Sequence, residues 1–149
     1  MRVKETGVTG TRFISRLLPI SNTCYSNLSD IELLATKLID PVFCVKDPIT
    51  NEIAPLKFAI AFNSRLCSQI KKEEVISRVA SLVKEPHTVD LTKPDVTIVI
   101  EIFKNICGIS LVRDFHELKK YNIQLVGQLG RENLASKASQ KDEAPIENA

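Results

Sequence analysis

Residues 96–103 have the sequence VTIVIEIF. After three intervening residues, KNI, residues 107–112 have the sequence CGISLV. The apolar, β-branched run over 96–103 predicts a central strand that is covered on both faces. Lys104 and Asn105 predict a tight turn, since asparagine tolerates the left-handed conformation that such turns often need. Residues 107–112 then return as a strand, and Gly108 within it predicts a bulge or a close backbone approach. An antiparallel hairpin is therefore expected here.

Upstream of the hairpin, the apolar pattern predicts two further strands. Residues 11–20 (TRFISRLLPI) are expected to form the first strand of the fold, with Pro19 ending it. Residues 56–62 (LKFAIAF) alternate between large apolar and smaller side chains, which predicts another strand. Residues 42–55 predict a loop or a short hairpin around Asp47-Pro48.

Two helices are predicted between these strands. Leu28–Ile39 has apolar residues at helical spacing, and Pro41 is expected to close this helix. Either Asn27 or Ser29 could be its N-cap residue. Residues 71–84 form a second amphipathic pattern that ends before Pro86. The fold class is therefore α/β, a single domain with a mixed sheet in β-α-β-α-β-β order and a C-terminal antiparallel hairpin.

Composition sets the expected limits of this domain. Residues 1–10 contain two glycines without apolar periodicity and are expected to be a flexible leader before a domain over residues 11–125. A short helix is expected over residues 115–120. Residues 126–149 are expected to be a polar tail, which after Gly130 holds too few apolar groups to offset the entropy of ordering and should be disordered.

The composition also excludes several classes of protein. The 149 residues are 44% hydrophobic and 26% charged, as in an ordinary soluble domain. No apolar run approaches the roughly 20 residues that span a bilayer, and the N-terminus lacks the pattern of a secretory signal. The four cysteines form no C-x-x-C pair and the chain has two histidines, so no metal site is expected. The thiols are expected to be reduced and partly buried.

Most signatures of enzymes are missing from the sequence. The five glycines form neither a dinucleotide-binding motif nor a phosphate-binding loop, and no G-x-S-x-G motif is present. A small hydrolytic site could combine His87, Asp90 and a cysteine, but a single histidine at a turn more often satisfies local hydrogen bonds. Glu101, a carboxylate in an apolar strand, is interpreted as half of a structural ion pair rather than as a catalytic acid.

The basic residues allow two interpretations. The net charge is +2, and Arg12 and Arg16 would share one face of the first predicted strand. They could be solvated surface charges, or part of a row of phosphate contacts. Aromatic residues are scarce, and those in predicted strands, including Phe13 and Phe103, are expected in the core. RNA binding would then depend on backbone charge and shape rather than on base stacking.

Several segments of the chain resemble one family. They include TRFISRLLPI (11–20), LKFAIAFNSR (56–65), and above all HTVDLTKPDVTIVIEIFKNICGISLV (87–112). Together they resemble the THUMP domain of the eukaryotic adaptor that is needed to form N4-acetylcytidine in tRNA. The resemblance covers residues 11–125.

The resemblance implies a tRNA-binding adaptor that is not an enzyme and holds no cofactor. Its partners would be tRNA and an RNA cytidine acetyltransferase, and the target would be a cytidine in the D-arm of serine and leucine tRNAs. It also implies a nuclear, chiefly nucleolar location, with the cytoplasm as a second one. Two alternatives are a module that mainly stabilises the acetyltransferase and the RNA-binding piece of another tRNA-modifying enzyme.

The expected RNA-binding residues combine the resemblance with the charges. We expect the cations to neutralise phosphates near the tRNA acceptor end, and Asn105 to shape the turn or bond to a ribose. With about three to five phosphate contacts, the log–log salt slope should be roughly −0.7 to −0.9 per contact. The expected set is Arg12, Arg16, Arg65, Lys93, Lys104 and Asn105.

Overall fold

The computed structural model describes residues 2–141 and divides the chain into two compact units. One unit is Pro19–Asp114 and contains the whole sheet. The other combines the residues up to Leu18 with those from Phe115 onward. Each unit is described by itself.

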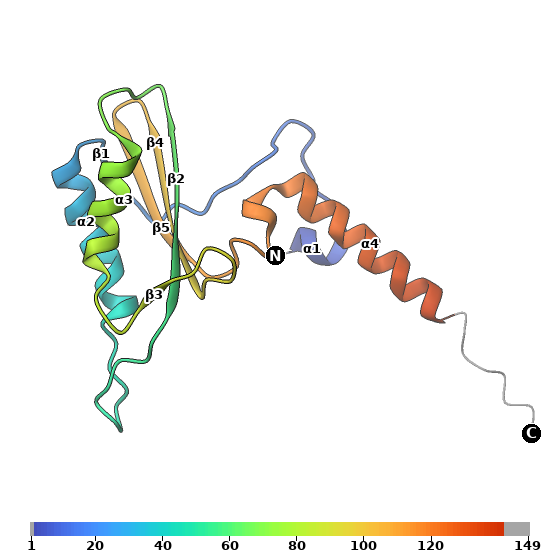
Figure 1. The fold of residues 1–149 in the computed structure, drawn as a ribbon. Helices are drawn as coiled ribbons and strands as arrows, with labels where there is room; N and C mark the ends of the chain where they lie inside the picture. The colour runs from blue at the N-terminus through green and yellow to red at the C-terminus, as the bar shows by residue number, and fades with distance from the viewer. Residues whose placement is uncertain (1, 142–149) are drawn as a thin grey trace, which may run out of the picture. The chain divides into compact units, whose positions relative to one another are not determined.

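The sheet of the unit Pro19–Asp114 has five strands in the order β1-β5-β4-β2-β3 (Figure 1). Strand β5 is antiparallel to both β1 and β4, while β2 is parallel to β4 and to β3, so the sheet is mixed. The predicted hairpin is confirmed, and its first strand lies at the centre of the sheet. The strands are β1 (Asn22–Tyr25), β2 (Lys57–Arg65), β3 (Thr88–Val89), β4 (Val96–Phe103) and β5 (Ile106–Val112).

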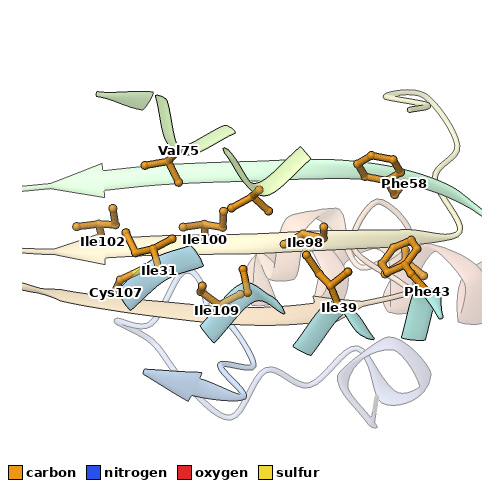
Figure 2. Packing of buried hydrophobic residues seen from close by; sticks show 13 residues of the cluster. Ile31, Ile39, Phe43, Phe58, Val75, Ile98, Ile100, Ile102, Cys107 and Ile109 are labelled. Carbon is orange, nitrogen blue, oxygen red and sulfur yellow. The ribbon is translucent and has the colours of Figure 1, made fainter. Parts of the chain in front are cut away.

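Helices α2 (Leu28–Phe43) and α3 (Lys72–Leu82) pack on one face of this sheet. Every second residue of β4 points towards them, and Figure 2 shows these side chains among those of the helices. Burial of each such isoleucine contributes roughly 1.5–3 kcal/mol. The buried cluster comprises Ile31, Ala35, Ile39, Phe43, Phe58, Val75, Val79, Val96, Ile98, Ile100, Ile102, Cys107 and Ile109.

The prediction of a first strand over residues 11–20 is wrong. This segment has no strand, and its one sheet-like contact is an isolated bridge between Arg16 and Asn122. Phe13, which was expected in the core, is 92% exposed. Residues 11–20 have apolar side chains in both alternating phases, but no neighbouring strand pairs along them. The first strand is β1, whose polar sequence NTCY carries no strong apolar signal but pairs along β5.

Helix α2 runs past the proline that was expected to end it. Pro41 lies in its last turn, where its ring removes one i→i−4 hydrogen bond, and burial of Phe43 beyond it in the core offsets part of that cost. At the other end Asn27 is the N-cap, since its side chain accepts the Asp30 N–H at 2.8 Å. Around Asp47 the expected short hairpin is present, with a bridge between Lys46 and Ile53.

The other unit contains helices α1 (Arg2–Thr6) and α4 (Ile123–Lys141), with a single 3-10 turn over Lys119–Tyr121. The helices approach closely at Gly130, where an added Cβ would lie 2.8 Å from the Lys4 carbonyl oxygen.

Two expectations therefore differ from the structure, since residues 2–6 and 131–141 are helical. The tail is poor in apolar groups but rich in alanine, lysine and glutamine, which favour helix. Residues 142–149 lie outside the described residues.

Candidate nucleic-acid interface

Four strands place one residue each in a row at the end of the sheet next to the β4–β5 turn. The pairing aligns Tyr25 with Ile106, Ile106 with Phe103, and Phe103 with Arg65. We call Tyr25, Ile106, Phe103 and Arg65 the end row. Its side chains lie on the sheet face opposite α2 and α3, because the intervening residues of β4 and β5, such as Ile102 and Cys107, enter the core.

The end row is open to solvent, although it is mostly apolar. Tyr25 is 68% exposed, and Ile106 and Phe103 are each 53% exposed. By contrast, Val96, Ile98 and Ile100 of the same central strand are at most 1% exposed. The end row is therefore a continuous exposed patch of two aromatic rings and an aliphatic side chain, with a guanidinium at one end.

The β4–β5 turn adds a second cation to this patch. Lys104 has a φ of 54°, in the left-handed region that non-glycine residues rarely adopt. Its backbone N–H donates to the Arg65 carbonyl at 3.0 Å, and the Ser26 hydroxyl donates to its carbonyl at 3.1 Å. Its ammonium lies 5.6 Å from the centre of the Phe103 ring. The turn thus fixes the backbone of Lys104 while its side chain lies against the end row.

A shallow polar hollow lies between the β4–β5 turn and the β2–α3 loop. Its volume of about 260 Å³ is below the roughly 300–1,000 Å³ of typical small-molecule sites. Leu66, at its rim, has a φ of 55° and is 73% exposed. Such a hollow suits a ligand that extends beyond it. Its lining residues are Ser26, Leu66, Cys67, Ser68, Gln69, Lys104 and Asn105.

The next row of the sheet contains the acidic residue that the sequence analysis had singled out. Glu101 is half-buried, and its carboxylate accepts a hydrogen bond from the Asn63 amide at 2.8 Å. Within residues 2–141, no cation lies within ion-pair distance of it. The predicted ion pair is therefore wrong: an amide from the neighbouring strand satisfies this carboxylate.

The six residues expected to bind RNA occupy three places. Arg65, Lys104 and Asn105 meet at the end of the sheet just described. Lys93 lies before the start of β4 and Lys104 follows its end, so the whole strand of 8 residues, about 26 Å long, lies between them along the chain. There Asp90 accepts its backbone N–H and also contacts Lys57. The structure therefore does not bring Lys93 together with Lys104.

Arg12 and Arg16 belong to the other unit. Arg12 lies 5.9 Å from the centre of the exposed Phe13 ring, and both arginines are exposed. Among the described residues, neither they nor Arg65, Lys93 and Lys104 form an ion pair. Whether any of these residues binds RNA stays a prediction.

Both ring nitrogens of His87 contact backbone groups rather than a cysteine or an acid. His87 accepts the Leu56 N–H through Nδ1 at 3.1 Å, and its Nε2 lies 2.7 Å from the Phe43 carbonyl, so both nitrogens are engaged by backbone groups. Burial raises the pKa of Cys107 to about 12 and also raises the pKa of Cys24. A protonated thiol is a poor nucleophile. These observations favour the interpretation of His87 as a structural residue.

The sequence analysis missed the two aromatic members of the end row. Phe103 was expected in the core, yet it shares the phase of Thr97 and Glu101, which lie on the face away from the helices. The polar Glu101 was the available signal that this phase faces away from the helices, and only its end at Phe103 is exposed, since Thr97 and Val99 are each 1% exposed. Tyr25 carried no signal, because its strand was not predicted.

Comparison with known proteins supports the family resemblance. A family profile described as "THUMP domain" matches residues 25–112, which lie within the unit that holds the sheet and the end row. The chain belongs to the THUMP domain family. Human THUMP domain-containing protein 1 is 37% identical over 144 residues, covering 93% of this chain and 39% of the relative. The Saccharomyces cerevisiae protein named tRNA acetyltransferase TAN1 is 33% identical over 121 residues, covering 76% and 41%.

The THUMP domain chain therefore spans about two fifths of the length of these relatives. A crystal structure of a Pyrococcus horikoshii protein shares its fold, with a TM-score of 0.54 and 18% identity over 72% of this chain and 34% of that chain. Among the described residues, no helix is long and apolar enough to cross a bilayer. The same residues hold no cluster of three potential metal ligands.

Proposed function

We propose that this THUMP domain chain binds tRNA and presents it to an RNA cytidine acetyltransferase, without carrying out chemistry itself. The product would be N4-acetylcytidine in the D-arm of serine and leucine tRNAs, and the location would be the nucleus. The name of the yeast relative supports the link to tRNA acetylation.

The observation that carries the proposal is the meeting of Arg65, Lys104 and Asn105 at one end of the sheet. Within residues 2–141 Arg65 and Lys104 have no ion-pair partner, and together with the exposed Asn105 amide they can bind phosphate and ribose oxygens. Helices α2 and α3 also begin at this end, because β1 and β2 lead into them there, and helix N-termini favour anions. Asp30 in the first turn of α2 offsets part of this effect.

A tRNA-binding titration across salt concentrations tests the binding step. The double variant Arg65→Ala/Lys104→Ala should bind more weakly, and its log–log salt slope should be shallower by about 1.4–1.8, the sum of two phosphate contacts. The control Lys46→Ala/Lys84→Ala removes the same charge from exposed residues that follow the C-terminal ends of α2 and α3, away from the end row. Equal losses in both double variants would mean that binding follows net charge and would remove this site from the proposal.

The cellular role is tested by deleting the gene and analysing the nucleosides of purified tRNA. Acetylcytidine should disappear and should return with the control variant but not with Arg65→Ala/Lys104→Ala. Unchanged acetylcytidine after deletion would assign the chain to another tRNA-modifying system. Restoration by a variant that no longer binds tRNA would favour a role in stabilising the acetyltransferase.

A further inference from the structure

We propose that the end row is a stacking surface for unpaired nucleotides of an RNA strand, in which Phe103 and Tyr25 each take one base. The inference rests on the proposed function, because it assumes that the chain binds RNA. It adds a kind of contact that differs from the phosphate contacts made by cations, and it specifies the class of RNA structure that this surface accepts.

The two aromatic rings of the end row are exposed to solvent. An isolated apolar side chain on a surface needs no explanation. Here, however, Tyr25, Ile106 and Phe103 lie side by side in strict register across three strands, each at least half exposed. Aromatic side chains presented on an open sheet face are a common way for proteins to stack unpaired bases.

The two rings of the end row are spaced too widely to hold one base between them. Ile106 separates Tyr25 from Phe103, so their backbones lie two strand spacings apart, about 9.6 Å. A base held between two rings needs about 7 Å, twice the roughly 3.4 Å rise of stacked nucleic acid. The two rings are therefore placed to take separate bases, with Ile106 as an apolar contact between them.

Two cations lie beside the Phe103 ring of the end row. Arg65 is the next neighbour of Phe103 across the sheet, and the Lys104 ammonium lies over the Phe103 ring. Both cations can reach phosphates next to a base stacked on that ring. In the adjacent row the Glu101 carboxylate repels phosphates, so a strand would follow the end row rather than continue down the sheet face.

These contacts select unpaired RNA. Bases inside a double helix stack on one another, so their faces are not available to protein side chains. Stacking surfaces of this kind tolerate any base, because each base has an aromatic face. The end row should therefore discriminate between unpaired and paired RNA more than between base types.

The test measures binding of a short oligouridine and of an RNA duplex by fluorescence anisotropy. Phe103→Ala and Tyr25→Ala should each weaken oligouridine binding by roughly 5- to 150-fold while changing duplex binding little. The matched control is Phe13→Ala, since Phe13 is also an exposed phenylalanine beside a cation, but in the other unit. It should bind oligouridine as the wild type does.

A tryptophan variant reports on stacking directly. The chain contains no tryptophan, so Phe103→Trp introduces a single indole fluorophore. It should retain oligouridine binding, and its emission should be quenched when a base stacks on the ring. Far-ultraviolet circular dichroism of every variant establishes that it is folded.

The outcomes separate this inference from the proposed function. Wild-type affinity in folded Phe103→Ala, or equal affinity for duplex and oligouridine, would overturn base stacking while leaving phosphate binding by Arg65 and Lys104 intact. Failure of the wild type to bind either RNA or tRNA would overturn the proposed function itself. Loss of acetyltransferase capture in Phe103→Ala, with RNA binding unchanged, would assign the end row to a protein partner and overturn the inference.

Discussion

Replacement of Lys104 by glycine should stabilise the fold and weaken RNA binding at the same time. Lys104 holds a φ of 54° in the β4–β5 turn, where a side chain costs about 1–2 kcal/mol. Glycine removes that cost but loses about 0.5–1 kcal/mol through the greater freedom of the unfolded chain. The free energy of unfolding should therefore rise by up to about 1.5 kcal/mol, which raises Tm by up to roughly 6 °C.

The same substitution removes the ammonium beside Phe103. If Lys104 contacts one phosphate, the log–log salt slope of tRNA binding should become shallower by about 0.7–0.9. Leu66→Gly is the matched control, because Leu66 has a φ of 55° and is 73% exposed but carries no charge. It should gain similar stability without a change in the salt slope.

Denaturant unfolding and a salt titration of tRNA binding measure the two effects separately. A loss of stability in Lys104→Gly would refute the strain argument. An unchanged salt slope in a stabilised Lys104→Gly protein would refute the phosphate contact. A changed slope in Leu66→Gly would indicate that the slope depends on the shape of the loops rather than on the charge of Lys104.

Three further predictions concern the rest of the sheet unit. His87→Ala should lower the free energy of unfolding by about 2–4 kcal/mol, because two contacts with backbone groups and the packing of the ring are lost. The log–log salt slope of RNA binding should stay unchanged in a binding titration. Backbone N–H donors and Lys57 lower the pKa of Asp90 from its ordinary 3.8 to about 2. The ionised Asp90 carboxylate should therefore stabilise the fold fully above about pH 4, and this stabilisation should be lost as the pH falls through about 2. Denaturant unfolding should show this pH dependence in the wild type but not in Asp90→Asn. Gly108→Ala should lower the free energy of unfolding by about 1–3 kcal/mol, because its Cβ would lie 2.8 Å from Ile20 Cγ2. In a double-mutant cycle, Ile20→Ala should restore part of this free energy, and additive effects of the two substitutions would contradict the contact.

The sheet shows how far periodicity predicts structure. The nearly continuous apolar run VTIVIEIF predicted that β4 is a central strand, since a strand buried on both faces needs apolar groups in both phases, and the turn residues after it predicted the hairpin. The same reasoning failed for residues 11–20, where apolar residues are present but no partner strand pairs with them. A short polar strand such as β1 exists because β5 offers its backbone donors and acceptors, which no local pattern encodes.

The candidate site was predicted in part for the same reason. Arg65 ends a strand and Lys104 and Asn105 occupy a turn, and local sequence locates such positions well. Lys93 also follows a turn signal, but the parallel arrangement of β2 and β4 puts it at the opposite end of the sheet. The exposure of Phe103 depended both on its phase and on its place at the end of β4, since Val99 in the same phase is 1% exposed.

By itself, the sequence determined the central hairpin, two amphipathic helices and the absence of nucleotide-binding motifs, since each of these follows from the order of side chains within a few residues. Only the tertiary structure placed Tyr25, Ile106, Phe103 and Arg65 next to one another. They come from four strands spread over 82 positions from Tyr25 to Ile106, and strand pairing alone sets their register. Hydrogen bonding between distant backbones therefore created the surface on which the proposed RNA contacts depend.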